Sequence, residues 1–106
     1  MQVKAALLRQ EAAAFSLESV ELESPRANEV LVRIVGVGVC HTDVKVQHGH
    51  RPVPHPIVLG HEGSGVVEEV GSAVSKVQPG DHVVLTYNSC GVCPNCQNAQ
   101  AAYCDD

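Results

Sequence analysis

The sequence predicts a mainly β fold, a partly open barrel or rolled sheet that carries one short helix. Three observations lead to this expectation. Short apolar segments rich in Val and Ile recur along the chain, and glycine and proline interrupt them at close intervals. Only one segment, about two turns long, has a helical pattern. With 106 residues the chain is expected to form one domain, residues 1–106, with a feasible but thin core.

The first two strands are expected at residues 3–8 and 15–22. The first segment is short and apolar, and in the second the apolar residues alternate with polar ones, as in a strand with one buried face. The alternation slips near Glu18 and Ser19, which predicts a β-bulge. Pro25 then favours a turn before the next strand.

Residues 29–39 have the strongest strand pattern, because they are rich in Val and Ile and contain Arg33 as the one charge inside the segment. Gly36 and Gly38 predict a bend in this strand or a close approach of another segment. The helical pattern follows directly, at residues 41–48.

The last two strands are expected at residues 63–70 and 81–87. Both segments are short and rich in valine, and Gln-Pro-Gly-Asp at residues 78–81 predicts a turn that introduces the second. The final seventeen residues then hold four of the five cysteines.

The composition argues against two classes of partner. The formal net charge is −5 at pH 7, no basic run occurs and aromatic residues make up 3%, so few side chains could pair with nucleic-acid phosphates or stack on bases. No apolar run approaches the roughly twenty residues of a membrane span, so no membrane partner is expected. The segment that starts at Met1 does not resemble a signal peptide, so a cytoplasmic location with reduced thiols is expected.

Four cysteines have the spacing of a metal clamp. Cys90, Cys93 and Cys96 form two overlapping Cys-x-x-Cys turns, and Cys104 follows eight residues after them. Such turns bring three sulfurs to one point, and a fourth sulfur completes a tetrahedron around one soft cation, most simply Zn²⁺. Because four thiolates leave no open position, this site is expected to staple a lobe at residues 88–106 and to do no chemistry.

Three other interpretations of these cysteines stay open. Disulfides would need an oxidising compartment. An iron–sulfur cluster also uses Cys-x-x-Cys-x-x-Cys, although in the bacterial pattern the next cysteine comes sooner and is followed by proline, whereas here Asp105 follows Cys104. A thioredoxin-like redox pair needs a strand and a helix around one Cys-x-x-Cys, which the residues around Cys90 do not supply.

Two further segments, residues 38–43 and 59–63, place metal-ligating and proton-transferring groups at strand ends. A thiolate from Cys40, an imidazole from His61 and one more ligand would make a catalytic zinc site, whose fourth position stays open for water or a substrate oxygen. Taken singly, Cys40 is equally well explained as a small buried hydrophobe and His61 as a loop histidine with its hydrogen bonds satisfied.

Taken together, these motifs resemble the N-terminal GroES-like catalytic domain of the medium-chain, zinc-dependent alcohol dehydrogenases. The most specific part is Gly-His-Glu-Gly-Ser-Gly at residues 60–65 with Gly71 and Val74, which matches the zinc signature of that family. The motif around Cys40, a Gly-Asp-His-Val motif and the four-cysteine lobe follow in the family's order and spacing. Residues 49–62 and 80–87 have sequences most similar to those of the aryl-alcohol, or benzyl-alcohol, branch of the family.

The resemblance implies roles for the residues of these segments. Cys40 and His61 would bind the catalytic zinc, and Glu62 would be a nearby carboxylate that can exchange with water on the metal. Asp43 would accept a hydrogen bond from the ligand histidine and so fix its tautomer. Thr42 would take the proton of the alcohol. The ligands of the structural zinc would be Cys90, Cys93, Cys96 and Cys104.

The reaction implied by the resemblance is hydride transfer from a zinc-bound alkoxide to NAD, which oxidises a primary or aryl alcohol to an aldehyde. His41 would lie near the phosphates of that cofactor. The partners implied are a small alcohol or aldehyde, a Rossmann domain that is not part of this chain, and further subunits, since family members form dimers or tetramers.

The chain departs from the family pattern in four respects. It contains neither the third protein ligand of the catalytic zinc nor the Gly-x-Gly-x-x-Gly of a Rossmann domain, so this chain alone is expected to be inactive. Lys45 stands where some members have a histidine, so the proton relay is expected to end at a cofactor hydroxyl, Lys45, His48 or His50. Ala99 stands where glycine is common, and a positive φ at Ala99 would cost about 1 kcal/mol.

Two functions of other classes also remain as alternatives. The absence of a cofactor domain favours a stand-alone zinc-binding or interaction module, but that function gives no reason for Cys40, Thr42 and His61 to occur together. An iron–sulfur electron carrier would be brown when purified, whereas a zinc protein is colourless.

Overall fold

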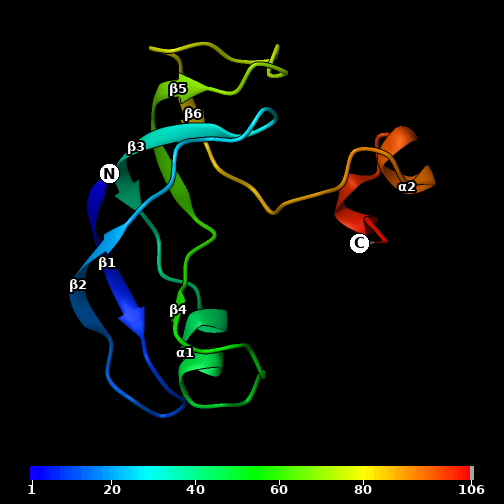
Figure 1. The fold of residues 1–106 in the computed structure, drawn as a ribbon. Helices are drawn as coiled ribbons and strands as arrows, with labels where there is room; N and C mark the ends of the chain where they lie inside the picture. The colour runs from blue at the N-terminus through cyan, green and yellow to red at the C-terminus, as the bar shows by residue number, and fades with distance from the viewer. Residues whose placement is uncertain (106) are drawn as a thin grey trace.

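The fold consists of two small antiparallel sheets, a two-turn helix and a separate cysteine-bearing lobe (Figure 1). This architecture is seen in a computed structural model that describes residues 1–105. Asp106, the last residue of the lobe expected at residues 88–106, lies outside the described residues. The elements are β1 (Gln2–Leu8), β2 (Ser16–Glu21), β3 (Val30–Val37), α1 (His41–Gln47), β4 (Ile57–Val58), β5 (Gly63–Val70), β6 (His82–Val84), α2 (Pro94–Gln97) and the 3₁₀ helix η1 (Ala101–Tyr103).

Both sheets are built from antiparallel neighbours, in the orders β2-β1-β4 and β3-β5-β6. The expected mainly β fold with open sheets and a short helix is therefore confirmed. β4 was not predicted, because a two-residue strand in a proline-rich loop has no periodic pattern. The strand expected at residues 81–87 ends earlier, at Val84, since the chain then leaves the sheet towards the lobe (Figure 1).

The β-bulge predicted near Glu18 and Ser19 is wrong. β2 pairs with β1 in one continuous register, from Glu21 opposite Gln2 to Ser16 opposite Leu7. As a result Glu18 is half-buried, while Leu17 is 82% exposed. The alternation of apolar and polar residues in this strand therefore does not predict which of its faces is buried.

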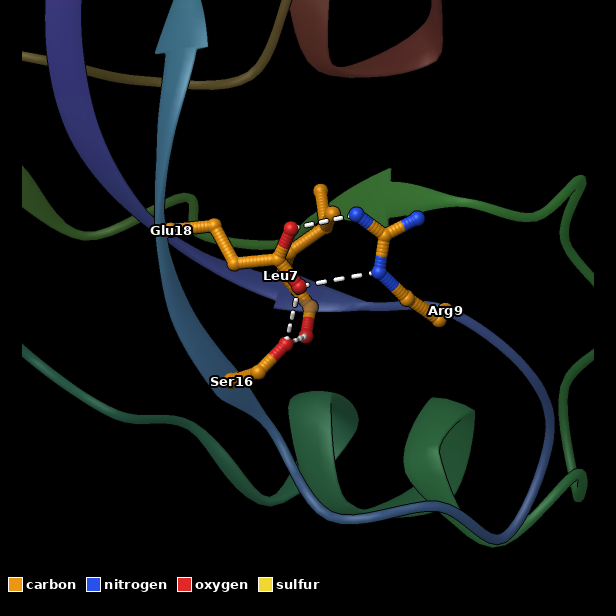
Figure 2. Close-up of polar contacts among 4 residues, drawn as sticks. All are labelled: Leu7, Arg9, Ser16 and Glu18. Carbon is orange, nitrogen blue, oxygen red and sulfur yellow. Dashed lines mark hydrogen bonds and ion pairs between the residues drawn. The ribbon is translucent and has the colours of Figure 1, made fainter.

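Polar partners explain why Glu18 tolerates this position. Figure 2 shows its carboxylate between the guanidinium of Arg9 and the hydroxyl of Ser16. Arg9 Nε donates to Glu18 Oε1 over 2.9 Å, Arg9 Nη2 donates to the other carboxylate oxygen, and Ser16 Oγ donates to Oε1 over 2.6 Å. A charged group can be half-covered by protein when its oxygens are paired in this way.

The register shifts occur instead between β3 and β5, at Leu31/Val32 and at Ile34/Gly36. The second shift involves Gly36, one of the two glycines at which a bend or a close approach was predicted. Gly65 lies beside it, and a Cβ there would stand 2.3 Å from the carbonyl oxygen of Arg33, so no larger residue fits without moving the backbone. Close strand approach is thus the physical reason for this glycine of the zinc signature.

The core is small, and β1, α1 and β5 contribute to it. The buried apolar side chains are Leu7, Leu8, Val46 and Val67. Val46 belongs to α1, whose last residue accepts a hydrogen bond from Ala12 N–H over 2.7 Å. The accessible surface is 7944 Å², whereas a compact monomer of this mass exposes about 5,700 Å². The sheets are therefore open, with much of their apolar surface uncovered.

The lobe follows β6 and stands apart from both sheets (Figure 1). It contains α2 and η1, which pack on each other. Within residues 1–105 the structure has no helix long and apolar enough to cross a membrane.

Gly71→Ala should destabilise the protein by about 2 kcal/mol or more, because a Cβ at this position would stand 1.9 Å from the carbonyl oxygen of Arg26 and the backbone would have to move. Gly36→Ala is the matched control, since its Cβ would meet only the Ser64 hydroxyl, at 3.3 Å. Urea unfolding measures both. Equal midpoints for the two variants would contradict this account of the glycine.

Glu18→Gln should lower stability at neutral pH and converge with the parent protein in acid. The pKa of Glu18 is lowered because Arg9, and then Ser16, donate hydrogen bonds to its carboxylate. A lowered folded-state pKa adds stability above the unfolded pKa, and that stability is lost as the pH falls through the folded value. Unfolding curves across the acidic range measure the convergence. Lys4→Gln is the control, because Lys4 makes no ion pair within residues 1–105.

Candidate metal centres

The four cysteines expected to bind one cation are brought together in the lobe. Their sulfurs all lie within 4.8 Å of one another. Cys93 is the N-cap of α2, and its sulfur accepts the N–H of Cys96 over 3.4 Å. The sulfur of Cys90 accepts the N–H of Cys93 over 3.2 Å, and the sulfur of Cys104 accepts the N–H of Cys90 over 3.3 Å. Each Cys-x-x-Cys turn thus aims backbone N–H groups at sulfur, an arrangement that favours thiolate.

The acidities of these thiols show that the cluster holds its negative charge unevenly. The pKa of Cys93 is lowered to about 6, because the backbone N–H groups of Asp105 and Cys96 donate to its sulfur. The N–H of Gly91 acts to lower the pKa of Cys96, but burial and the neighbouring sulfurs outweigh it and raise that pKa to about 12. These values belong to the interacting cluster. Four adjacent thiolates therefore need a cation, and an all-sulfur tetrahedral set fits Zn²⁺.

Asn95 closes the lobe and was missed from sequence. Its side-chain amide donates to the backbone carbonyl of Tyr103 over 2.8 Å and to the carboxylate of Asp105 over 3.1 Å. These bonds tie the first turn of α2 to the segment that carries Cys104. An asparagine inside a Cys-x-x-Cys turn has no periodic signal that could have identified this role.

A second donor cluster contains Cys40, His61 and Glu62, with one ligand atom from each residue within 4.8 Å of the others. Cys40 is the N-cap of α1, three residues after the end of β3, and His61 and Glu62 directly precede β5. The pairing of these two strands therefore brings together residues about twenty positions apart. A sulfur, an imidazole nitrogen and a carboxylate oxygen fit a zinc site with an open position.

Asp43 lies at the junction of the two segments. Its Oδ2 accepts the N–H of Cys40 over 3.1 Å, closing a capping box at the start of α1. Its Oδ1 lies 3.7 Å from Nδ1 of His61, close enough for electrostatic attraction but beyond hydrogen-bond distance. This contact favours a proton on Nδ1. The other ring nitrogen, Nε2, lies 3.9 Å from a Glu62 oxygen and therefore faces the cluster.

Cys40 and His61 are tuned towards a thiolate and an imidazolium in the metal-free protein. The pKa of Cys40 is lowered by hydrogen bonds from the Thr42 hydroxyl, from the Thr42 N–H and from His61. The pKa of His61 is raised by its hydrogen bond to the Cys40 sulfur, with further contributions from Asp43 and Glu62. The sulfur is thus prepared as a ligand, and a cation would displace the proton of the imidazolium.

The remaining residues of the first segment take two positions. The Thr42 hydroxyl lies 3.5 Å from the Cys40 sulfur, at the cluster. His41 is exposed and lines a small pocket of about 150 Å³ on α1, which it shares with the candidates for the outer end of the relay. Those candidates are Lys45, His48 and His50.

An open hollow of about 520 Å³ lies beside the second cluster and is lined in part by His61 and Glu62. A larger hollow, of about 830 Å³, lies over β3 and β6 and is lined by none of the predicted site residues. The smaller hollow is therefore the one that could admit a substrate to the donor cluster.

Gly38→Ala should move the Glu62 carboxylate and weaken metal binding at the second cluster while the fold survives. A Cβ at residue 38 would stand 2.1 Å from Oε2 of Glu62, the flexible end of that side chain. Competition with a chelator measures zinc affinity, and Gly36→Ala is the control. Unchanged affinity in Gly38→Ala would show that the carboxylate does not depend on this glycine.

Ala99→Gly should stabilise the lobe by about 1 kcal/mol, because Ala99 has φ +59°, a conformation that glycine adopts without strain. The structure thereby meets the condition under which strain was expected at Ala99. The expected result is slower zinc loss to a chelator. Ala102→Gly, a change inside η1, should not slow that loss.

The chain matches the family model described as the alcohol dehydrogenase GroES-like domain over residues 26–106. It is 52% identical over 104 residues to a geraniol dehydrogenase of Castellaniella defragrans, covering 98% of this chain and 28% of that protein. A solved benzyl alcohol dehydrogenase of Acinetobacter calcoaceticus is similar with a TM-score of 0.95 and 45% identity, over 99% of this chain and 29% of that one.

A second solved relative, an alcohol dehydrogenase zinc-binding domain protein of Burkholderia ambifaria, is similar with a TM-score of 0.95 and 51% identity, over 99% of this chain and 28% of that one. The chain therefore spans less than a third of the length of these relatives. The motif order, the two gathered donor clusters and these similarities agree, and the chain belongs to the alcohol dehydrogenase GroES-like domain family.

Proposed function

We propose that this chain forms the N-terminal catalytic domain, residues 1–106, of a zinc-dependent alcohol dehydrogenase that oxidises primary or aryl alcohols to aldehydes with NAD. The carrying observation is the cluster of Cys40, His61 and Glu62 beside an open hollow. Mixed sulfur, nitrogen and oxygen donors with room for a further ligand are typical of catalytic zinc sites, whereas four sulfurs are typical of structural ones.

The two clusters would bind zinc for different purposes. The lobe cysteines would hold an ion that only stabilises the lobe, residues 88–106. Cys40 and His61, with Glu62 as an exchangeable carboxylate, would hold the second ion. A zinc ion bound there would act as a Lewis acid and polarise a substrate oxygen. The third protein ligand and the nicotinamide-binding domain would belong to the part of the relatives' length that this chain does not match.

Residues of α1 would handle the proton of the alcohol. The Thr42 hydroxyl lies beside the cluster, where it can accept that proton as the hydride leaves. Lys45 follows one helical turn later and lines the pocket on α1, so it provides an outward route. Asp43 would keep the His61 tautomer in place during these steps, and His41 would face the phosphates of the cofactor.

The substrate class is proposed from the names of two relatives, geraniol dehydrogenase and benzyl alcohol dehydrogenase. Both alcohols are primary and have an unsaturated group next to the reacting carbon. The hollow beside His61 has apolar walls from Val37, Val84 and Leu85, which suit such a group.

A chimera tests the proposal. The matching N-terminal segment of the geraniol dehydrogenase is replaced by this chain, and reduction of NAD by geraniol or benzyl alcohol is measured. The chimera should be active, and Cys40→Ser within it should lower kcat/KM by about 100-fold or more, because the metal loses a ligand. His82→Ala, a change at an exposed strand residue outside both clusters, should leave activity unchanged. A Cys40→Ser chimera as active as its parent would refute the proposal.

A further inference from the structure

The aromatic ring of Tyr87 is stacked on the imidazole of His61. The ring centroids are 5.1 Å apart and the planes differ by 18°. Tyr87 lies in the segment that leads from β6 to the lobe, two residues beyond the last backbone hydrogen bond to β5, which joins Leu85 N–H to Gly63 O over 2.8 Å. A ring from the connecting segment therefore covers one face of a candidate metal ligand.

The other contacts of His61 are all made at the edge of its ring: the hydrogen bond to the Cys40 sulfur, the Asp43 carboxylate near Nδ1 and the Glu62 carboxylate near Nε2. Asp43 faces Nδ1 at 3.7 Å, which is too long for a directional hydrogen bond. The residue before His61 is Gly60, whose φ of +142° few other residues adopt, so the backbone here is intrinsically permissive. These three contacts set which edge of the imidazole faces the cluster, but they leave the ring plane able to rotate about the line that joins its two nitrogens.

We propose that Tyr87 is a positioning residue, which holds the imidazole plane of His61 so that Nε2 points at the cluster with Cys40 and Glu62. A flat ring stacked nearly parallel resists the rotation that the Asp43 contact permits. Asp43 and Tyr87 together then constrain the imidazole in two independent directions. The inference rests on the proposed metal site at Cys40, His61 and Glu62.

The ring face of Tyr87, and not its hydroxyl, performs this role. The hydroxyl makes no hydrogen bond within residues 1–105, and the side chain is 68% exposed, so it is not held by burial in a core. Phenylalanine keeps the stacked face and removes only the hydroxyl. Tyr87→Phe should therefore preserve the effect, whereas Tyr87→Ala should abolish it.

Cobalt(II) titration tests the inference, because cobalt bound by four sulfurs and cobalt bound by mixed ligands absorb differently. In the parent chain the lobe and the second cluster should each take up one ion. Tyr87→Ala should weaken binding at the second cluster by about 10-fold or more and leave the lobe unchanged, as for other residues that orient a ligand histidine. Tyr87→Phe should bind like the parent. Tyr103→Ala is the matched control, since Tyr103 is similarly exposed at 72% but stacks on no histidine among the residues that the structure describes.

Nuclear magnetic resonance of the metal-free protein provides a second readout. Removing the Tyr87 ring should shift the His61 ring protons, whereas Tyr103→Ala should not. Two cobalt ions bound with parental affinity by Tyr87→Ala would overturn the inference and leave the metal site standing. Uptake of a single cobalt ion by the parent chain would overturn the proposed metal site and this inference together.

Discussion

The antiparallel pairing of β3 with β5 is the interaction on which the second donor cluster depends. Val37 lies opposite Gly63, and beyond this pair Gly38 N–H donates to the carbonyl of Glu62 over 2.8 Å. That hydrogen bond joins the end of one strand to the start of the other. Cys40 follows the first end and His61 precedes the second, so a thiol and an imidazole from separate motifs meet. Without this register the sequence motifs would have no common site.

Sequence patterns predicted the strands, the helix and the cysteine cluster, which depend on local spacing. They failed for features that depend on residues distant in the sequence. The strand around Arg33 and the two-turn helix follow from their own residues, and the four sulfurs follow from the cysteine spacing. The bulge predicted near Glu18 is absent, because Arg9 supplies a partner that makes a half-buried carboxylate acceptable. The stack of Tyr87 on His61 depends on the path of a segment without secondary structure, which no periodicity encodes.

The two clusters differ in what holds them together without a cation. Strand pairing and a capping box position the second cluster, so its geometry is largely formed by the fold. The lobe stands apart from the sheets, and none of its residues from 88 to 105 is buried. Its thiols cannot all ionise side by side. Its stability must therefore come mainly from metal binding, as in other small metal-stapled units. One ion would maintain structure, and the other would occupy a site made ready for chemistry.

The central claim is that the protein binds one zinc ion through sulfur alone and a second through Cys40, His61 and Glu62. X-ray absorption at the zinc edge of the fully loaded protein tests it most directly, because sulfur differs from nitrogen and oxygen in scattering strength and in bond length. The account predicts a first shell dominated by sulfur with a clear nitrogen and oxygen component. His61→Ala should reduce the nitrogen contribution, and Cys40→Ser should reduce the sulfur contribution. A pure sulfur shell that neither substitution changes would contradict it.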